Sequence, residues 1–558
     1  MKNKNKYLYI FLGGLLLLGA CKKSTLDQVN PNQPNPDVSL QTEGGLNAYA
    51  AGILQRTIYP VPNEGNSNLM AIVMTQHSIM GDEVFLPYGN FSFRWTDQVY
   101  QVTLPGGTVV KNPIGVTQQV SLQGFNSRSA ADRNAFIYEW TLGYFFISQA
   151  NTLLHSLSTP PASLSASKVA AYRAWAYWWK GYSYSRIGSI YLSGIINNDY
   201  TGVTNGTFVD HNAIIAEANK AFDSCATILQ TLPGGGDDDY GAVMGAIVLD
   251  FNKNKNTVLP YPTPAEWLRQ LNTYKARNLL VNKKTADMTQ ADWQSVNDLA
   301  TNGLQLGDNY FLFGMSPNAA NDLTNAFLHP MALLGPGVQW TFLSERLVQD
   351  FKAGDARYTR DVLTLPVNPG KDPYYNISAF TNIRSRGLQF GTHYAAVPIE
   401  NGGDWATAQN LGTVPIGCSS EENELMLAEA QINLGNIDAG LAHVDKVRVS
   451  ENAGLAAVSG TGLSLAAAKE ELRTERRIGL FEKGVAFYDA RRWGVTAPVA
   501  SGGGRANAIV YVPHSLINTA NDQPLPCFME YNYMDYWDIP QNELDFNAPA
   551  SGSAAVKN

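Results

Sequence analysis

The chain has 558 residues, of which 45% are hydrophobic, 11% aromatic and 16% charged. Its formal net charge of −8 excludes the basic surface with which proteins bind nucleic acid. This length is enough for several layers of core or for two closely packed subdomains. The scarcity of charge and the abundance of aromatic residues suit an uncharged polar ligand, although large secreted proteins are often rich in tyrosine too.

The first twenty residues have the form of a secretory signal. Three lysines precede an apolar run over residues 7–19, which is shorter than the ~20 apolar residues that span a bilayer. The run ends in small residues followed by Cys21, the pattern of a lipobox. We therefore expect a signal peptide over 1–20 and a lipid on Cys21; the alternative is a plain secretory signal. Lys22, where an aspartate would favour the inner membrane, points to the outer membrane.

Residues 21–38 form a proline-rich and asparagine-rich stretch, which predicts a flexible stalk after the lipidated cysteine. A helix pair is expected next, over about 39–80. The clearest helical period lies in 134–157, where Phe136, Trp140 and Ile147 fall on one face. A proline-rich break follows, and Ser165 or Ser167 can cap a second helix over 168–191.

Further helices are expected over 210–232, with Asp210 as the cap, and then over about 265–282, 289–305, 421–450 and 465–492. Helices joined by short loops form αα-hairpins, and several hairpins in series suggest a tetratricopeptide-like solenoid, although no clean 34-residue repeat occurs. The segments 81–130, 233–262, 306–420 and 495–558 have no helical period and are rich in Gly, Pro, Asn and Tyr. Long loops on a helical scaffold often carry the binding site.

No catalytic motif is present: the sequence has no G-x-S-x-G, Walker A, G-x-G-x-x-G or H-E-x-x-H pattern. The three remaining cysteines, Cys225, Cys418 and Cys527, allow at most one disulfide, and the histidines are too widely spaced for a local metal motif. The acidic run 237–239 predicts a solvated turn. We expect no enzymatic activity, metal or cofactor, although the paired carboxylates of a glycosidase would leave no fixed spacing.

The segment 473–494 is predicted to be helical, with Ile478, Phe481, Val485 and Tyr488 on one face and many charged residues elsewhere. Guanidinium groups beside carboxylates allow two interpretations, an anion-binding site or a set of ion pairs that holds the helix to the scaffold. We favour the ion pairs.

This segment resembles the late helix of the SusD/RagB family of outer-membrane nutrient-binding lipoproteins. The matching residues are Glu475, Arg476, Arg477, Leu480, Phe481, Glu482, Asp489, Arg492, Trp493 and Gly494. Gly479, Lys483 and Ala486 stand where the family has Glu, Gly and Arg. Three other segments, 424–436, 267–280 and 537–547, resemble further family patterns, so the resemblance extends along the chain.

The resemblance implies a mainly α fold, in which tetratricopeptide-like helix pairs (about 39–80, 134–191, 210–305 and 421–492) support a loop-rich binding half (about 81–130, 306–420 and 495–558) within one domain, 39–558. It also implies a SusC-like TonB-dependent transporter as partner, a glycan as ligand and a lipid anchor as the membrane contact. A peptide ligand on the same scaffold, or a lipid-anchored glycosidase, are the alternatives.

Sugar rings stack on aromatic side chains, and their hydroxyls bond to Asn, Asp, Gln and Arg. Since the family draws its site from loops of the early and middle chain, the predicted ligand-binding residues are Asp82, Tyr88, Asn90, Arg94, Trp95, Tyr310, Gln339 and Trp340. Trp95 is expected in an exposed loop that stacks on the ligand. Trp140, Trp179 and Trp493 follow helical patterns, which favours a structural role.

Overall fold

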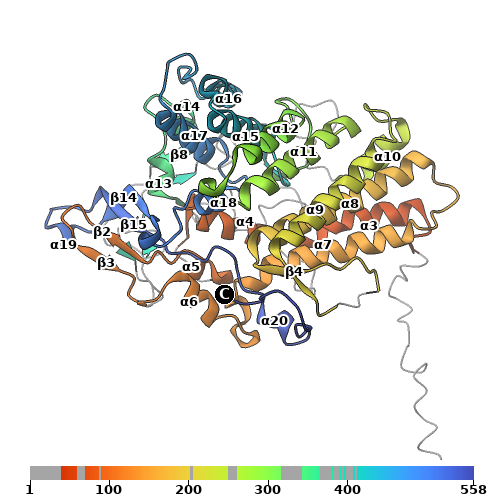
Figure 1. Cartoon of the computed structure of the whole chain (residues 1–558), viewed down its shortest axis with the longest axis horizontal. Helices are drawn as coiled ribbons and strands as arrows, with labels where there is room; N and C mark the ends of the chain where they lie inside the picture. Colours follow the sequence, from red (N-terminus) through yellow and green to blue (C-terminus); the bar gives the residue numbers. More distant parts are fainter. Residues whose placement is uncertain are drawn as a thin grey trace, which may run out of the picture.

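The computed structural model describes residues 39–58, 69–86, 90–201, 205–248, 261–315, 342–364, 380–381, 389–392, 394–396, 406–408 and 411–558. The predicted signal peptide, Cys21 and the stalk lie outside these residues. Within them the chain is mainly helical, which confirms the predicted fold class (Figure 1).

The first half of the chain builds one end of the molecule from helices that pack on one another. These are α3 (Glu43–Ile58), α4 (Leu69–Met80), α7 (Phe136–Ser156), α8 (Ala166–Ile190) and α9 (His211–Leu229). The Ser165 side chain accepts a hydrogen bond from the Lys168 amide, and the Asp210 side chain accepts one from the Ala213 amide, so both residues cap as expected. Trp175, Trp178 and Trp179 of α8 are fully buried in the largest core cluster.

The acidic run 237–239 was wrongly predicted to be a turn. Asp237 caps a helix, α10 (Asp238–Ile247), by accepting a hydrogen bond from the Tyr240 amide, and Asp238 and Asp239 occupy the first turn. Carboxylates are favourable there because the helix dipole is positive at its N-terminus. The helix lies in the segment 233–262, for which no helical period was recognised.

A second group of helix pairs lies above the first in Figure 1. In this group α11 (Pro264–Val281) packs on α12 (Gln290–Thr301), α15 (Ser420–Asn433) packs on α16 (Ile437–Ser450), and α17 (Leu465–Gly479) packs on both α15 and α16. Thr263 and Glu266 form a capping box at α11, and Thr289 and Asp292 form one at α12. This tetratricopeptide-like arrangement agrees with the expected fold.

The helix expected over 465–492 is interrupted. α17 ends at Gly479, and α18 (Ala486–Arg492) begins seven residues later. Glu482 has a φ of 59° and Gly484 a φ of 73°, and this left-handed backbone cannot continue an α-helix. Ile478, Phe481, Val485 and Tyr488 therefore do not share one helical face. The bend instead brings Asp489 of α18 against Arg476 of α17.

Short strands and helices occupy the described parts of the segments that lacked a helical period. The longest strands, β14 (Arg505–Val512) and β15 (Gln523–Glu530), join β2 (Gln101–Thr103) and β3 (Val109–Lys111) in an antiparallel sheet of order β14-β15-β2-β3. Phe528 pairs with Thr103 in this sheet, so it connects the early and the late chain.

A second four-stranded sheet has the order β1-β7-β11-β8 and consists of β1 (Val84–Phe85), β7 (Phe342–Leu343), β11 (Tyr394–Ala396) and β8 (Val362–Thr364). The remaining strands are β4 (Ser193–Ile195), β5 (Phe208–Asp210), β6 (Leu312–Met315), β9 (Phe380–Thr381), β10 (Gln389–Phe390), β12 (Ala406–Ala408) and β13 (Leu411–Pro415). The short helices are η2 (Asn90–Ser92), α5 (Phe93–Thr96), α6 (Gln118–Gly124), η3 (Arg128–Arg133), η5 (Thr285–Asp287), α13 (Glu345–Val348), α14 (Ala356–Asp361), η9 (Val499–Ser501), α19 (His514–Ile517) and α20 (Gln541–Leu544).

Cys225, Cys418 and Cys527 are buried and carry free thiols. Among the described residues, no helix combines the length and the apolar character that crossing a membrane requires.

Candidate functional site

A cavity of about 310 Å³ lies where the end of α4, the helices α17 and α18 and the strand β14 meet. We call it the central cavity. Its polar and aromatic lining includes Asp82, Gln349, Arg473, Arg477, Trp493, Arg505, Asn507 and Tyr531. These residues come from six separate parts of the chain, so the cavity exists only in the folded protein.

Gly81 sets how closely α18 approaches this cavity. A Cβ atom at Gly81 would lie 2.5 Å from the Cβ of Ala486 and 2.8 Å from the Phe487 nitrogen. Both distances are shorter than any normal van der Waals contact, so a larger residue would push α18 away. The next residue, Asp82, has a φ of 54°, and this left-handed turn directs the chain out of α4 and past the cavity.

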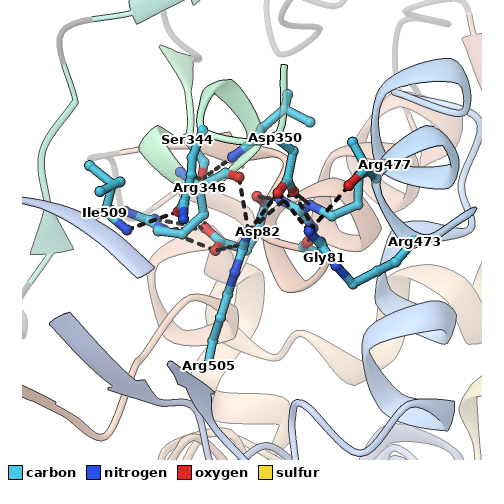
Figure 2. A network of polar contacts seen from close by, with 12 residues as sticks. Gly81, Asp82, Ser344, Arg346, Asp350, Arg473, Arg477, Arg505 and Ile509 are labelled. Carbon is cyan, nitrogen blue, oxygen red and sulfur yellow. Dashed lines mark hydrogen bonds and ion pairs between the residues drawn. The ribbon is translucent and has the colours of Figure 1, made fainter. Parts of the chain in front are cut away.

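Asp82 is buried and its carboxylate is fully engaged (Figure 2). It accepts hydrogen bonds from Arg346 Nη2 at 2.7 Å and Nε at 2.9 Å, from the Ser344 hydroxyl at 2.8 Å and from the Tyr531 hydroxyl at 2.7 Å. Burial raises the pKa of Asp82, but the Arg346 guanidinium outweighs it and holds the pKa well below its usual range. Asp82 therefore remains ionised and fixes Arg346.

Asp350 holds three more arginines (Figure 2). Its carboxylate accepts hydrogen bonds from Arg477 Nε at 2.7 Å, from Arg473 Nη2 at 2.9 Å and from Arg505 Nη2 at 3.1 Å. The other two nitrogens of Arg477 donate to the carbonyl oxygens of Gly81 at 2.9 Å and of Asp82 at 2.8 Å. Burial raises the pKa of Asp350, and the three guanidinium groups, Arg505 first, lower it further than burial raises it.

The network around the central cavity therefore contains more positive than negative charge. Four guanidinium groups share the two buried carboxylates. Of the other lining carboxylates, Glu470 is 63% exposed and bonds to Arg473 at 2.7 Å, and Asp489 is paired with Arg476 and Arg492. Burial, with repulsion from Arg477, lowers the pKa of Arg505 despite the attraction of Asp350. Such a site favours a ligand with acceptor oxygens, since guanidinium groups only donate hydrogen bonds.

A second cluster of arginines and carboxylates adjoins the cavity, which Asp489 also lines, and its ion pairs are closed to solvent. Asp489 accepts hydrogen bonds from Arg476 Nε and from Arg492 Nε, each at 2.8 Å, and Arg492 also donates two bonds of 2.6 Å to Glu429 of α15. Every one of these side chains is at most 4% exposed. We call this group the α18 anchor. It bears out the interpretation of the late segment as a set of ion pairs, while Arg473 and Arg477 of the same segment line the cavity.

The predicted ligand-binding residues do not all gather at this cavity. Asp82 lines it, but as a partner of Arg346. Tyr88, Gln339 and Trp340 lie outside the described residues, so ligand contact by them stays a prediction. Asn90 begins η2, a short 3-10 helix, rather than lying in a loop.

Arg94 and Trp95 were expected in an exposed loop, and this expectation was wrong. Both lie in α5, where Arg94 is fully buried and Trp95 is half-buried with its ring centroid 4.9 Å from that of Phe125. Tyr310 is also buried and lines a different cavity, of about 270 Å³, with its hydroxyl 3.5 Å from Glu421 Oε2. Trp95 is half-buried because it packs against a cluster of buried apolar residues. Such packing produces no helical period in the sequence, so it could not be predicted.

Sequence reasoning missed Arg346, Asp350 and Arg505 as members of the site. No local pattern marks them, because Arg346 and Asp350 lie in and just after a four-residue helix, α13, and Arg505 begins a strand. Among the four arginines of the cavity network, only Arg473 and Arg477 had a recognisable sequence signal, since they belong to the charged late segment.

Comparisons with known proteins agree with this architecture. The model of the SusD family matches residues 424–550. A SusD-like carbohydrate-binding protein from Bacteroides fragilis has a TM-score of 0.55 and 15% identity, with 91% of this chain and 98% of that chain covered. A structure solved with a xylogluco-oligosaccharide has a TM-score of 0.55 and 14% identity, with 92% of this chain and 99% of that chain covered.

Surface glycan-binding protein A from Bacteroides uniformis has a TM-score of 0.53 and 14% identity, with 91% of this chain and 99% of that chain covered. No curated protein sequence matches the chain. The family match includes α17, α18 and β14, which supply much of the lining of the central cavity, and the likeness of fold extends over nine-tenths of the chain. The sequence match to the SusD family model thus falls on the last part of the chain, and the fold is similar to that of SusD-like structures.

Proposed function

We propose that the protein binds a glycan at the bacterial cell surface and passes it unchanged to a SusC-like TonB-dependent transporter. The observation that carries the proposal is the central cavity, in which planar guanidinium donors lie beside the aromatic rings of Trp493 and Tyr531. Sugar hydroxyls accept from such donors, and sugar rings pack on such rings. The match of residues 424–550 to the SusD family model and the similar fold of a SusD-like carbohydrate-binding protein support the same function.

A titration with glycans tests the central cavity. Arg473 is suited to the test because its side chain is 26% exposed and shares Asp350 with two other arginines, so its loss leaves that carboxylate paired. We expect Arg473→Met to weaken the binding of a cognate oligosaccharide about tenfold, which corresponds to ~1.4 kcal/mol. The melting temperature should barely change, since exposed ion pairs contribute ~0–1 kcal/mol.

A panel of plant and host oligosaccharides is first titrated to identify the ligand. A panel of peptides in the same assay tests the alternative ligand class. Lys111→Met is the matched control, because it removes an exposed charge from β3 and Lys111 does not line the central cavity. Binding of peptides but not of glycans would overturn the proposal. If the protein released reducing ends from a bound polysaccharide, the proposal that it passes the glycan on unchanged would be overturned.

We also propose that the mature protein is a lipoprotein of the outer membrane, with Cys21 as its anchor and a single domain after residue 38. Cys21→Ala should move the protein from the membrane fraction to the soluble fraction, because the polar chain has no other insertion element in its described part. The measurement is fractionation of cells that lack the transporter. A variant that stays with the membranes under these conditions would contradict the anchor.

A further inference from the structure

A second cavity, of about 420 Å³, opens between α7, α8 and α9, and we call it the side groove. Its lining combines Lys180 of α8, Glu217 and Lys220 of α9, His155 of α7 and Tyr200 from the loop after β4. It shares no lining residue with the central cavity.

Lys180 is an unusual feature of this groove. It is only 6% exposed, yet its ammonium group has no hydrogen bond or ion pair within 4.0 Å among the described residues. Nζ is not among the buried unpaired atoms, so the side chain is buried along its stem while the ammonium group opens into the groove, where an anionic ligand oxygen can reach it. The nearest aromatic ring, that of Tyr177, has its centroid 6.0 Å from Nζ and lines the same groove.

No carboxylate among the lining residues of the side groove forms an ion pair with Lys180. Glu217 is already engaged, because it accepts a hydrogen bond of 2.9 Å from the Asn198 amide and lies 3.5 Å from Lys220. The groove therefore contains two ammonium groups and one carboxylate. Burial lowers the pKa of Lys180 to about 8, although Glu217 opposes this, so most molecules keep the charge at neutral pH.

An aromatic surface lies in the same groove. The rings of His155 and Tyr200 are stacked, with centroids 3.4 Å apart and planes inclined by 7°. Tyr200 is 48% exposed, one of the few large aromatic side chains so open to solvent in the described part of the chain. A supported aromatic face beside hydrogen-bonding groups is the arrangement on which a sugar ring stacks, and an aliphatic anion would not use it.

We propose that the side groove is a second binding site, which takes an acidic sugar with its ring on Tyr200 and its carboxylate on the Lys180 ammonium. The site is independent of the central cavity, and the inference does not require that the central cavity bind a glycan.

Calorimetric titration of the full chain with trigalacturonate tests this site, with the fully methyl-esterified trisaccharide as the uncharged match. We expect the acid to bind at least tenfold more tightly than the ester. Lys180→Met should weaken binding of the acid at least tenfold without affecting the ester, and Tyr200→Ala should weaken both about tenfold. Lys111→Met removes the same charge outside the groove and should change nothing.

Lys180→Met should not unfold the protein, since it replaces a side chain buried along its stem by an apolar chain of similar length; if it does, the surface variant Tyr200→Ala decides. The inference is overturned if trigalacturonate does not bind, if the ester binds as tightly as the acid, or if binding is unchanged in both variants. In the last case the trisaccharide occupies another site, such as the central cavity, and the function proposed for that cavity stands unaffected.

Discussion

The α18 anchor and the central cavity use the same residue types for opposite purposes. In the anchor, Arg476 and Arg492 face Asp489 and Glu429, so charges balance and water is excluded. Around the cavity, four guanidinium groups share two buried carboxylates, and Arg473 and Arg505 reach solvent. An arginine-rich segment can therefore bind a ligand where its carboxylates are too few to pair every guanidinium group and where solvent reaches the network.

The largest expected effect tests the anchor. Asp489→Ala leaves two buried guanidinium groups without their shared carboxylate, and we expect the free energy of unfolding to fall by ~3–5 kcal/mol. Denaturant unfolding measures the change, while ligand affinity measured below the transition should be retained. Asp132→Ala, at an exposed carboxylate, should stay within ~0.5 kcal/mol of the wild type. A stable Asp489→Ala protein that no longer binds ligand would reverse the assignment of the two clusters.

A smaller loss of unfolding free energy is expected at Trp95, which packs in the structure and was also predicted to contact the ligand. Full burial of Trp makes its replacement by Ala cost ~3–5 kcal/mol, as we expect for Trp179→Ala. Trp95 is half-buried against Phe125, so Trp95→Ala should cost about 2 kcal/mol. Contact of Trp95 with the ligand stays a prediction, and if it exists the same variant should lower ligand affinity about tenfold to a hundredfold. Unchanged affinity in a titration of this variant would make Trp95 purely structural.

The last effect concerns pH and a carboxylate whose pKa is raised, whereas the pKa values of Asp82 and Asp489 are lowered. Burial raises the pKa of Glu451 to about 7, although Lys483 and Arg357 lower it. Since the unfolded value is about 4.3, the folded protein binds more protons between these pH values, and stability falls as the pH rises from about 4.5 to 7. A shift of this size corresponds to a loss of about 3 kcal/mol over this interval.

Glu451→Gln removes this titration, so its unfolding free energy should decline less than that of the wild type over the same interval. Urea unfolding at three pH values measures both slopes. Equal slopes would show that Glu451 is ionised throughout and that its neighbours compensate it as fully as they compensate Asp489.

Helical elements were predictable because their signals are local. Ser165 and Asp210 mark helix starts, and the spacing of Phe136, Trp140 and Ile147 marks a buried face of α7. The interruption after Gly479 was not predictable, since charged and apolar residues continue through it and only the left-handed φ of Glu482 ends the period. The cavity was predictable in part: Asp82 was recognised, but its partner Arg346 lies 264 residues away and leaves no spacing to recognise.

The sheet β14-β15-β2-β3 has a consequence for the order in which the chain can fold. Thr103 pairs with Phe528, so β2 gains its inner neighbour only after almost the whole polypeptide has been made. Until then one edge of β2 remains open to other strands, and such an edge is a template for aggregation. Pairing of strands so distant in sequence is also slow, because a long loop must close first. Nascent or truncated chains that stop before residue 523 therefore need protection by a chaperone, and loss of the last strands should produce insoluble protein rather than a smaller folded one.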